Sequence, residues 1–235
     1  MITMKFLDKG GFFSDPQKIL HFGNSGTGVR LMAGLLSTSE INATLTGDKS
    51  LSSRPMKRII DPLQEMNVSI THNNGLLPIK VFNHNNQYIP INHTLNVGSA
   101  QVKSCILLAA LNTKGTTKIV EKIPSRDHTE IMLKFLGANL IKEKNVIKLT
   151  SPNFLKPKEL KIPGDFSSAA FVIIAVLLSK KQSNIKRCGS KLLQDWSFRR
   201  FKKMNANITV KNKRKFNGEI VGDIEVESSN LVAQL

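Results

Sequence analysis

A short glycine-rich stretch, "GNSGTG" at residues 23–28, stands directly before an apolar run that is typical of a helix. Free backbone N–H groups and the dipole at a helix N-terminus attract anions. Gly26 and Gly28 would let an anion approach the backbone, and Asn24 and Thr27 could hydrogen-bond to it. We predict a phosphate or carboxylate loop here, with an ordinary turn as the alternative. The stretch matches neither the P-loop pattern nor G-x-G-x-x-G with a following acidic residue.

Two arginines stand near the expected starts of other helices. Arg54 precedes a proline in "SLSSRPMKR" (50–58), and Arg126 opens the acidic turn "SRDHTE" (125–130). A guanidinium can bind a carboxylate or phosphate through two parallel hydrogen bonds, so both are candidate anion ligands. A capping stretch with a surface arginine is the alternative. His128 has no partner that the sequence identifies, and we expect it to be structural rather than an acid–base catalyst.

A further polar cluster opens the otherwise apolar segment "VGSAQVKSCILLAAL" (97–111). A buried helix needs no Gly, Ser, Gln and Lys gathered at its start. Amide donors, hydroxyls and an arginine at the starts of successive helices suit a small, multiply anionic substrate better than a nucleic acid duplex.

The elements that must position these residues form a repeat. Three segments combine a Gly, small polar residues and an apolar helix: "FGNSGTGVRLMAGLLS" (22–37), "VGSAQVKSCILLAALN" (97–112) and "PGDFSSAAFVIIAVLLS" (163–179). Each is followed by a short alternating strand, an amphipathic helix and two closing strands, as the hydrophobic periods indicate. One such unit cannot bury its helix alone, so several must pack around shared helices.

The repeat predicts an α/β (α+β) fold made of βαβαββ units. The expected amphipathic helices lie within residues 53–67, 125–139 and 192–207. Residues 1–158 would hold about two units of a first domain, and residues 159–235 about one unit of a second. The proline- and lysine-containing stretch "LKPKELKIPG" (155–164) is the expected crossover between them.

The composition restricts the compartment and the partners. The net charge is +17 in 235 residues, which permits nucleic acid, acidic membranes or anionic small molecules as partners. No stretch interleaves aromatic and basic residues as a base-stacking surface would.

The apolar run Phe171–Leu178 is too short to span a bilayer, and the N-terminus has no signal-peptide pattern. Cys105 and Cys188 lack metal-ligand spacing, so we expect a reduced, cytoplasmic protein without a metal.

Five motifs resemble the 5-enolpyruvylshikimate-3-phosphate (EPSP) synthase family in order and spacing. They are "GNSGTGVRL", "GDKSLSSRPMKRIIDPLQEM", "SAQVKSCILLAAL", "SRDHTEIML" and "PGDFSSAAF". The likeness is good over about residues 20–180 and fades through 181–235. The related UDP-N-acetylglucosamine enolpyruvyl transferases share the fold but lack the "SAQVKS" and "SRDHTE" wording.

The resemblance implies a reaction and an architecture. The 5-hydroxyl of shikimate 3-phosphate adds to C2 of phosphoenolpyruvate, and phosphate leaves the tetrahedral intermediate. No metal or organic cofactor takes part. The implied fold is an inside-out α/β barrel of two domains, each with three βαβαββ units, in a protein that is a cytoplasmic monomer when full length.

The resemblance also implies the roles of individual residues. The implied ligands of phosphoenolpyruvate are Asn24, Gly26, Thr27, Arg54 and Gln101. The implied ligands of shikimate 3-phosphate are Ser99, Ala100, Gln101, Ser125 and Arg126. Lys103 and Ser104 would support the helix start, and Asp165 would be a helix N-cap rather than a catalytic residue.

Several family features are missing from this sequence. The N-terminal Lys-Ser…Arg motif is absent, and the catalytic Asp and the Lys/Glu acid–base group are expected beyond Leu235. We therefore assign no catalytic residue and expect the isolated chain to be a fragment that folds poorly and does not turn over. "KLLQDWSFRRFKKMN" (191–205) stands where an "NPTRTG"-like start is expected. Two alternatives remain: a basic, non-catalytic protein that binds nucleic acid or acidic partners through residues 199–215, and a truncated remnant.

Overall fold

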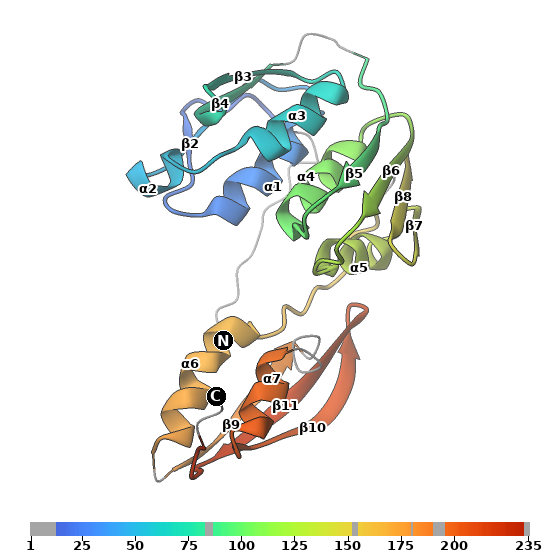
Figure 1. Ribbon diagram of the computed structural model, residues 1–235. Helices are drawn as coiled ribbons and strands as arrows, with labels where there is room; N and C mark the ends of the chain where they lie inside the picture. Colours follow the sequence, from blue (N-terminus) through green and yellow to red (C-terminus); the bar gives the residue numbers. More distant parts are fainter. Residues whose placement is uncertain (1–12, 83–86, 152–154, 180, 190–195, 233–235) are drawn as a thin grey trace. The chain divides into compact units, whose positions relative to one another are not determined.

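The chain forms two compact units in a computed structural model, Met1–Leu155 and Lys156–Leu235 (Figure 1). We call them the N-terminal unit and the C-terminal unit. The structure describes residues 13–82, 87–151, 155–179, 181–189 and 196–232.

The N-terminal unit contains the same series of elements twice. The first series comprises β1 (Leu20–His21), α1 (Gly26–Ser37), β2 (Ala43–Thr46), α2 (Lys49–Ser52), α3 (Lys57–Glu65), β3 (Ser69–Asn73) and β4 (Leu76–Phe82). The second comprises β5 (Asn92–Leu95), α4 (Ala100–Ala110), β6 (Gly115–Glu121), α5 (His128–Phe135), β7 (Leu140–Glu143) and β8 (Val146–Ser151). Apart from the short helix α2, the two series are the predicted βαβαββ repeat.

The two sheets of this unit have the same topology. Their strand orders are β1-β2-β4-β3 and β5-β6-β8-β7. In each sheet the first pair is parallel, with Leu20 opposite Leu45 and Asn92 opposite Lys118, and the remaining pairs are antiparallel. A parallel pair requires a crossover, and α1 and α4 are those crossovers. Each crossover helix therefore begins just after a first strand, which is where the candidate ligands lie.

The two crossover helices pack against each other, and the sheets lie outside them (Figure 1). Gly34 of α1 faces Cys105 of α4 so closely that a Cβ on Gly34 would lie 2.2 Å from the Cys105 carbonyl oxygen. Ala33 and Ala109 are also fully buried. Small residues thus let the two backbones meet, and the two helix starts come together.

The C-terminal unit contains a third, shorter series. Its elements are α6 (Phe166–Leu177), β9 (Gln182–Gly189), α7 (Trp196–Lys203), β10 (Asn207–Phe216) and β11 (Glu219–Glu227). The strands form an antiparallel sheet in the order β10-β11-β9. A single parallel bridge between Gly164 and Cys188 stands where β1 and β5 stand in the other two series. Among the described residues the three sheets remain separate, and none closes into a barrel.

Helix α6 differs from α1 and α4 in its surroundings. One side packs on the sheet of its unit through Phe166, Ile173 and Leu177. The residues Phe171 and Leu178 are 78% and 73% exposed. No helix of the described part of this unit covers that apolar side.

Candidate substrate-binding site

The glycine-rich loop forms the start of α1. Ser25 is the N-cap, and its Oγ accepts a hydrogen bond from the backbone N–H of Gly28 at 3.0 Å. Gly23 adopts a left-handed conformation with φ of 55°, which turns the chain from β1 into the helix. The loop thus has the geometry of a helix N-terminus, as predicted for an anion site.

Arg54 contacts this loop from the coil between α2 and α3. Its Nη2 donates to Asn24 Oδ1 and, at 3.4 Å, to Ser50 Oγ. The helix near Arg54 begins only at Lys57, so Arg54 precedes the helix by three residues rather than standing at its start. The structure therefore brings together two of the predicted phosphoenolpyruvate ligands, Asn24 and Arg54.

Gln101 joins the start of α4 to the start of α1. Its Nε2 donates to Thr27 Oγ1 at 2.8 Å, and its Oε1 accepts from Arg30 Nη1 at 3.0 Å. Thr27 and Gln101 are 74 positions apart in the sequence. All five residues that the resemblance implies for phosphoenolpyruvate, Asn24, Gly26, Thr27, Arg54 and Gln101, thus lie in one connected cluster.

Arg30 is the centre of this cluster, and the sequence analysis missed it. Besides Gln101, its guanidinium donates to the carbonyl oxygens of Gly26 and Pro55, both at 3.1 Å. Burial, followed by the positive charges of Arg54 and Arg58, lowers the pKa of Arg30. An arginine four residues after Gly26 lies on the same side of the helix, and that spacing could have revealed it.

The cluster carries uncompensated positive charge. Within the part of the chain that the structure describes, neither Arg30 nor Arg54 has a carboxylate within ion-pair distance. Two guanidinium groups beside a helix N-terminus favour an anion with more than one negative charge.

The start of α4 carries the other candidate ligands. Ser99 is the N-cap, and its Oγ accepts from the backbone N–H of Val102 at 3.4 Å. A hydroxyl that accepts a capping bond still has a proton to donate, so Ser99 can also donate to a bound anion. Ser99 and Ala100 are half-buried at the opening of the helix.

The loop that carries Ser125 and Arg126 lies beside this helix start. A Cβ on Gly98 would lie 3.2 Å from Ile123 Cγ2 and 3.4 Å from the Pro124 carbonyl oxygen. Ser125 donates to Glu121 Oε1 through its backbone N–H at 3.1 Å and its Oγ at 2.5 Å. Arg126 is exposed, and none of the described residues holds its guanidinium in an ion pair. The loop backbone is therefore anchored, while Arg126 is accessible to a ligand.

Lys103 lies in the first turn of α4, in surroundings that the sequence did not predict. It is fully buried, and its Nζ lies 3.0 Å from Glu121 Oε1 and 2.8 Å from Glu130 Oε1. The lysine and the two glutamates belong to three different elements, α4, β6 and α5. The sequence around each of them therefore does not indicate that they pair.

Metal ligands, membrane-spanning helices and reactive thiols are the other features that could indicate a function among the described residues. The described residues include no group of three His, Cys, Asp or Glu side chains placed to hold a metal ion. No described helix is long and apolar enough to cross a membrane. Burial raises the pKa of the Cys105 thiol to about 12 and that of Cys188 to about 11.

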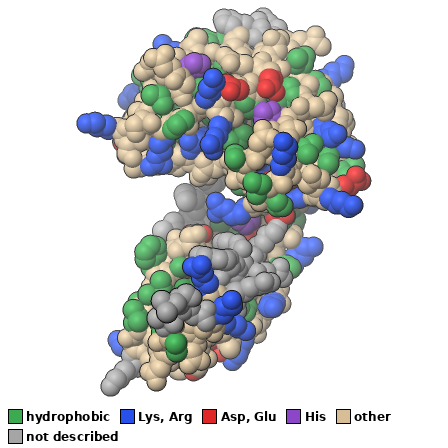
Figure 2. All heavy atoms as spheres, in the orientation of Figure 1, with side chains coloured by type: hydrophobic (Ala, Val, Ile, Leu, Met, Phe, Trp, Pro, Cys, Tyr) green, Lys and Arg blue, Asp and Glu red, His purple; other side chains and the backbone are tan. Residues whose placement is uncertain are grey.

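On the face that Figure 2 shows, the basic residues are spread out rather than gathered. Figure 2 shows Lys and Arg side chains scattered over the visible face of both units. In β10, Lys211 pairs with Glu225 at 2.6 Å and Arg214 pairs with Asp223 at 2.9 Å. The acidic residues of β11 thus offset part of the charge of the basic segment 199–215.

Repeated βαβαββ units with their helices inside define the fold class of the enolpyruvyl transferases. The EPSP synthase (3-phosphoshikimate 1-carboxyvinyltransferase) family model matches residues 4–231, so the chain belongs to that family.

Individual relatives agree with this assignment. The 3-phosphoshikimate 1-carboxyvinyltransferase of Clostridium tetani is 42% identical over 213 residues, which are 89% of this chain and 47% of the relative. That of Vesicomyosocius okutanii is 43% identical over 215 residues, 90% of this chain and 49% of the relative. The solved EPSP synthase of Acinetobacter baumannii superposes with a TM-score of 0.80 at 37% identity, over 91% of this chain and 48% of that chain. The chain spans about half the length of the curated relatives it matches.

Proposed function

We propose that this chain provides part of the substrate site for enolpyruvyl transfer from phosphoenolpyruvate to the 5-hydroxyl of shikimate 3-phosphate, with release of phosphate. The observation that carries the proposal is the cluster at the starts of α1 and α4, where Gln101 bonds to both Thr27 and Arg30. It unites a helix N-terminus, an amide and two guanidinium groups that form no ion pair with any described residue, which suits a ligand with a carboxylate and a phosphate.

The residues divide between the two substrates by location. In the proposal, Asn24, Gly26, Thr27 and Arg54 receive phosphoenolpyruvate at the start of α1. Ser99 and Ala100 at the start of α4, with Ser125 and Arg126 from the neighbouring loop, receive shikimate 3-phosphate. Gln101 lies between the two groups and contacts both substrates.

Binding of shikimate 3-phosphate, measured by isothermal titration calorimetry, tests the proposal without requiring turnover. We expect saturable binding that Arg126→Gln weakens about 10- to 100-fold, because a hydrogen bond to a charged group contributes about 1.5–3 kcal/mol. Lys148→Gln is the matched control, since it removes an exposed positive charge from β8, outside the proposed site. Absence of binding, or equal losses in the two variants, would contradict the proposal.

The compartment and the remaining partners are also proposed. A reducing cytoplasm accords with Cys105 and Cys188, which are free, buried and located in different units. A monomer is expected for the complete protein. Binding of nucleic acid through residues 199–215 has less support, because Lys211 and Arg214 already pair with acidic residues. Salt-dependent binding to unrelated DNA would favour that alternative.

A further inference from the structure

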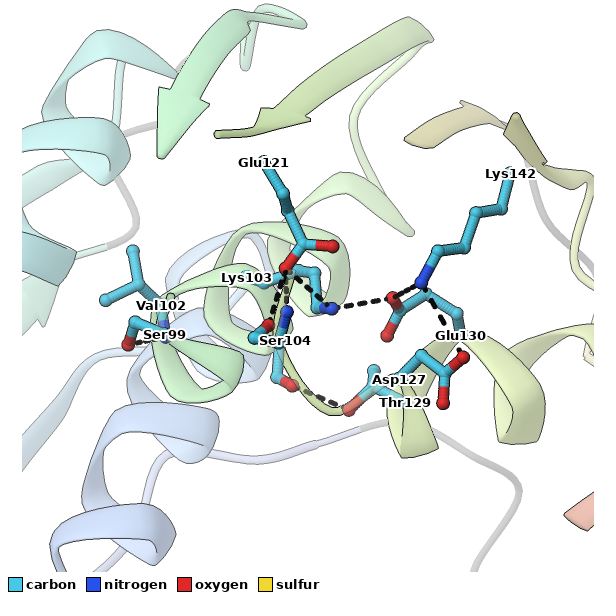
Figure 3. A network of polar contacts seen from close by, with 10 residues as sticks. Ser99, Val102, Lys103, Ser104, Glu121, Asp127, Thr129, Glu130 and Lys142 are labelled. Carbon is cyan, nitrogen blue, oxygen red and sulfur yellow. Dashed lines mark hydrogen bonds and ion pairs between the residues drawn. The ribbon is translucent and has the colours of Figure 1, made fainter. Parts of the chain in front are cut away.

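A lysine is fully buried in the N-terminal unit. Lys103 of α4 has no exposed surface, and the side chains of its two partners, Glu121 and Glu130, are each 2% exposed. Figure 3 shows the ammonium group between the two carboxylates. Removing three charges from water is costly, and an apolar replacement of such a group is often as stable or more stable. Stability alone is therefore a weak explanation for the network.

The network leads from α4 to the loop proposed to bind the substrate phosphate. The Glu121 oxygen that Lys103 contacts also accepts both hydrogen bonds from Ser125. A second link joins Ser104 Oγ of α4 to Thr129 Oγ1 of α5 at 2.6 Å. The loop between Glu121 and Thr129 is thus tied to α4 at both ends.

A second cation, Lys142, lies on the far side of the network. Lys142 of β7 lies 3.3 Å from Glu130 Oε1 and 3.6 Å from Asp127 Oδ2. Glu130 Oε2 is buried without a hydrogen-bond partner among the described residues. Glu130 therefore depends on Lys103 and Lys142, but it makes no contact with Ser125 in the network. The two partners of Lys103 differ in that only Glu121 reaches the loop.

We infer that Lys103 is a positioning residue for the phosphate of the bound substrate. By pairing with Glu121, it holds the loop of Ser125 and Arg126 against the start of α4. It also neutralises a carboxylate that would otherwise repel a phosphate bound at Ser125. This inference rests on the proposed function, because it concerns the same site.

Three variants separate positioning from stability. Lys103→Met replaces the lysine with an apolar side chain of similar length and leaves both glutamates without their shared cation. Adding Glu121→Gln or Glu130→Gln removes one leftover charge in each case. After Glu121→Gln, the side-chain amide could still accept both hydrogen bonds from Ser125, because its carbonyl oxygen occupies the same place as the carboxylate oxygen. The double variant with Lys103→Met and Glu130→Gln is the matched control, since Glu130 does not contact the loop.

Two measurements read the outcome: the affinity for shikimate 3-phosphate, by calorimetry, and the amide hydrogen exchange of residues 122–127. We expect Lys103→Met to weaken binding at least 10-fold and to speed exchange at Ser125. Adding Glu121→Gln should restore both, whereas adding Glu130→Gln should restore neither. If Lys103→Met alone does not fold, the two double variants make the same comparison.

Equal behaviour of the two double variants would overturn the inference, as would a folded Lys103→Met with unchanged affinity and exchange. Failure of the unaltered chain to bind shikimate 3-phosphate would count against the proposed function instead. Hydrogen exchange needs no substrate, so in that case it would still decide whether Lys103 positions the loop.

Discussion

The contact between α1 and α4 allows a sharp prediction for Gly34→Ala. A Cβ at this position would lie 2.2 Å from the Cys105 carbonyl oxygen and 2.8 Å from its Cα and carbonyl carbon. Ordinary contact begins at 3.4 Å, so the helices must separate by about 1 Å. All three atoms belong to the backbone and cannot rotate away. The substitution therefore has to move a whole helix.

The magnitude follows from two opposing terms. Overpacking a well-packed core costs about 1–3 kcal/mol, and an immovable backbone favours the upper end. Replacing a glycine inside a helix by alanine returns about 0.5–1 kcal/mol. We expect a net loss of about 2 kcal/mol in the free energy of unfolding of the N-terminal unit. A shift of about 1 Å would also stretch the 2.8 Å hydrogen bond between Gln101 and Thr27 beyond bonding distance.

Urea denaturation followed by far-ultraviolet circular dichroism measures the loss. Amide hydrogen exchange of β10 and β11 reports on the C-terminal unit and should not change. Gly164→Ala is the control, because the atoms nearest to its Cβ would lie 3.5 and 3.9 Å away and nothing need move. If Gly34→Ala were as stable as the unaltered chain, the close packing of α1 on α4 would be refuted.

Three further predictions concern separate parts of the chain. Arg30→Lys keeps the charge but loses the fork in which Nη1 reaches Gly26 and Gln101 while Nη2 reaches Pro55, so phosphoenolpyruvate affinity should fall about 10-fold. An unchanged calorimetric affinity would exclude Arg30 from the site. Hydrogen bonds, chiefly from Arg214, hold the pKa of Asp223 well below its usual range. Asp223 therefore contributes stability above about pH 4 that is lost on further acidification. Asp223→Asn should lower the stability of the C-terminal unit at pH 7, measured by the amide hydrogen exchange of β10 and β11, and remove that acid dependence. Phe171→Ser should reduce binding of the dye ANS to the exposed side of α6, and undiminished dye fluorescence would contradict this.

Much of the fold was predictable because its signals are local. A helix start depends on a cap and a few glycines within three or four residues, as at Ser25 and Ser99. Strands and helices follow from hydrophobic period, and the repetition of their order predicted the matching sheets of the N-terminal unit. The third copy departs from the predicted pattern, since its first strand is reduced to the bridge between Gly164 and Cys188.

The sequence by itself therefore determined the repeating unit and the helix starts that are proposed to bind an anion. The tertiary structure alone decided which distant groups meet. Arg30 and Gln101 are 71 positions apart, and they bond only because α1 and α4 pack closely at Gly34. Lys103 has the sequence pattern of an ordinary helix lysine, yet it is buried because two other elements place glutamates beside it. Such pairings depend on how whole elements pack, and no local interaction within a few residues encodes them.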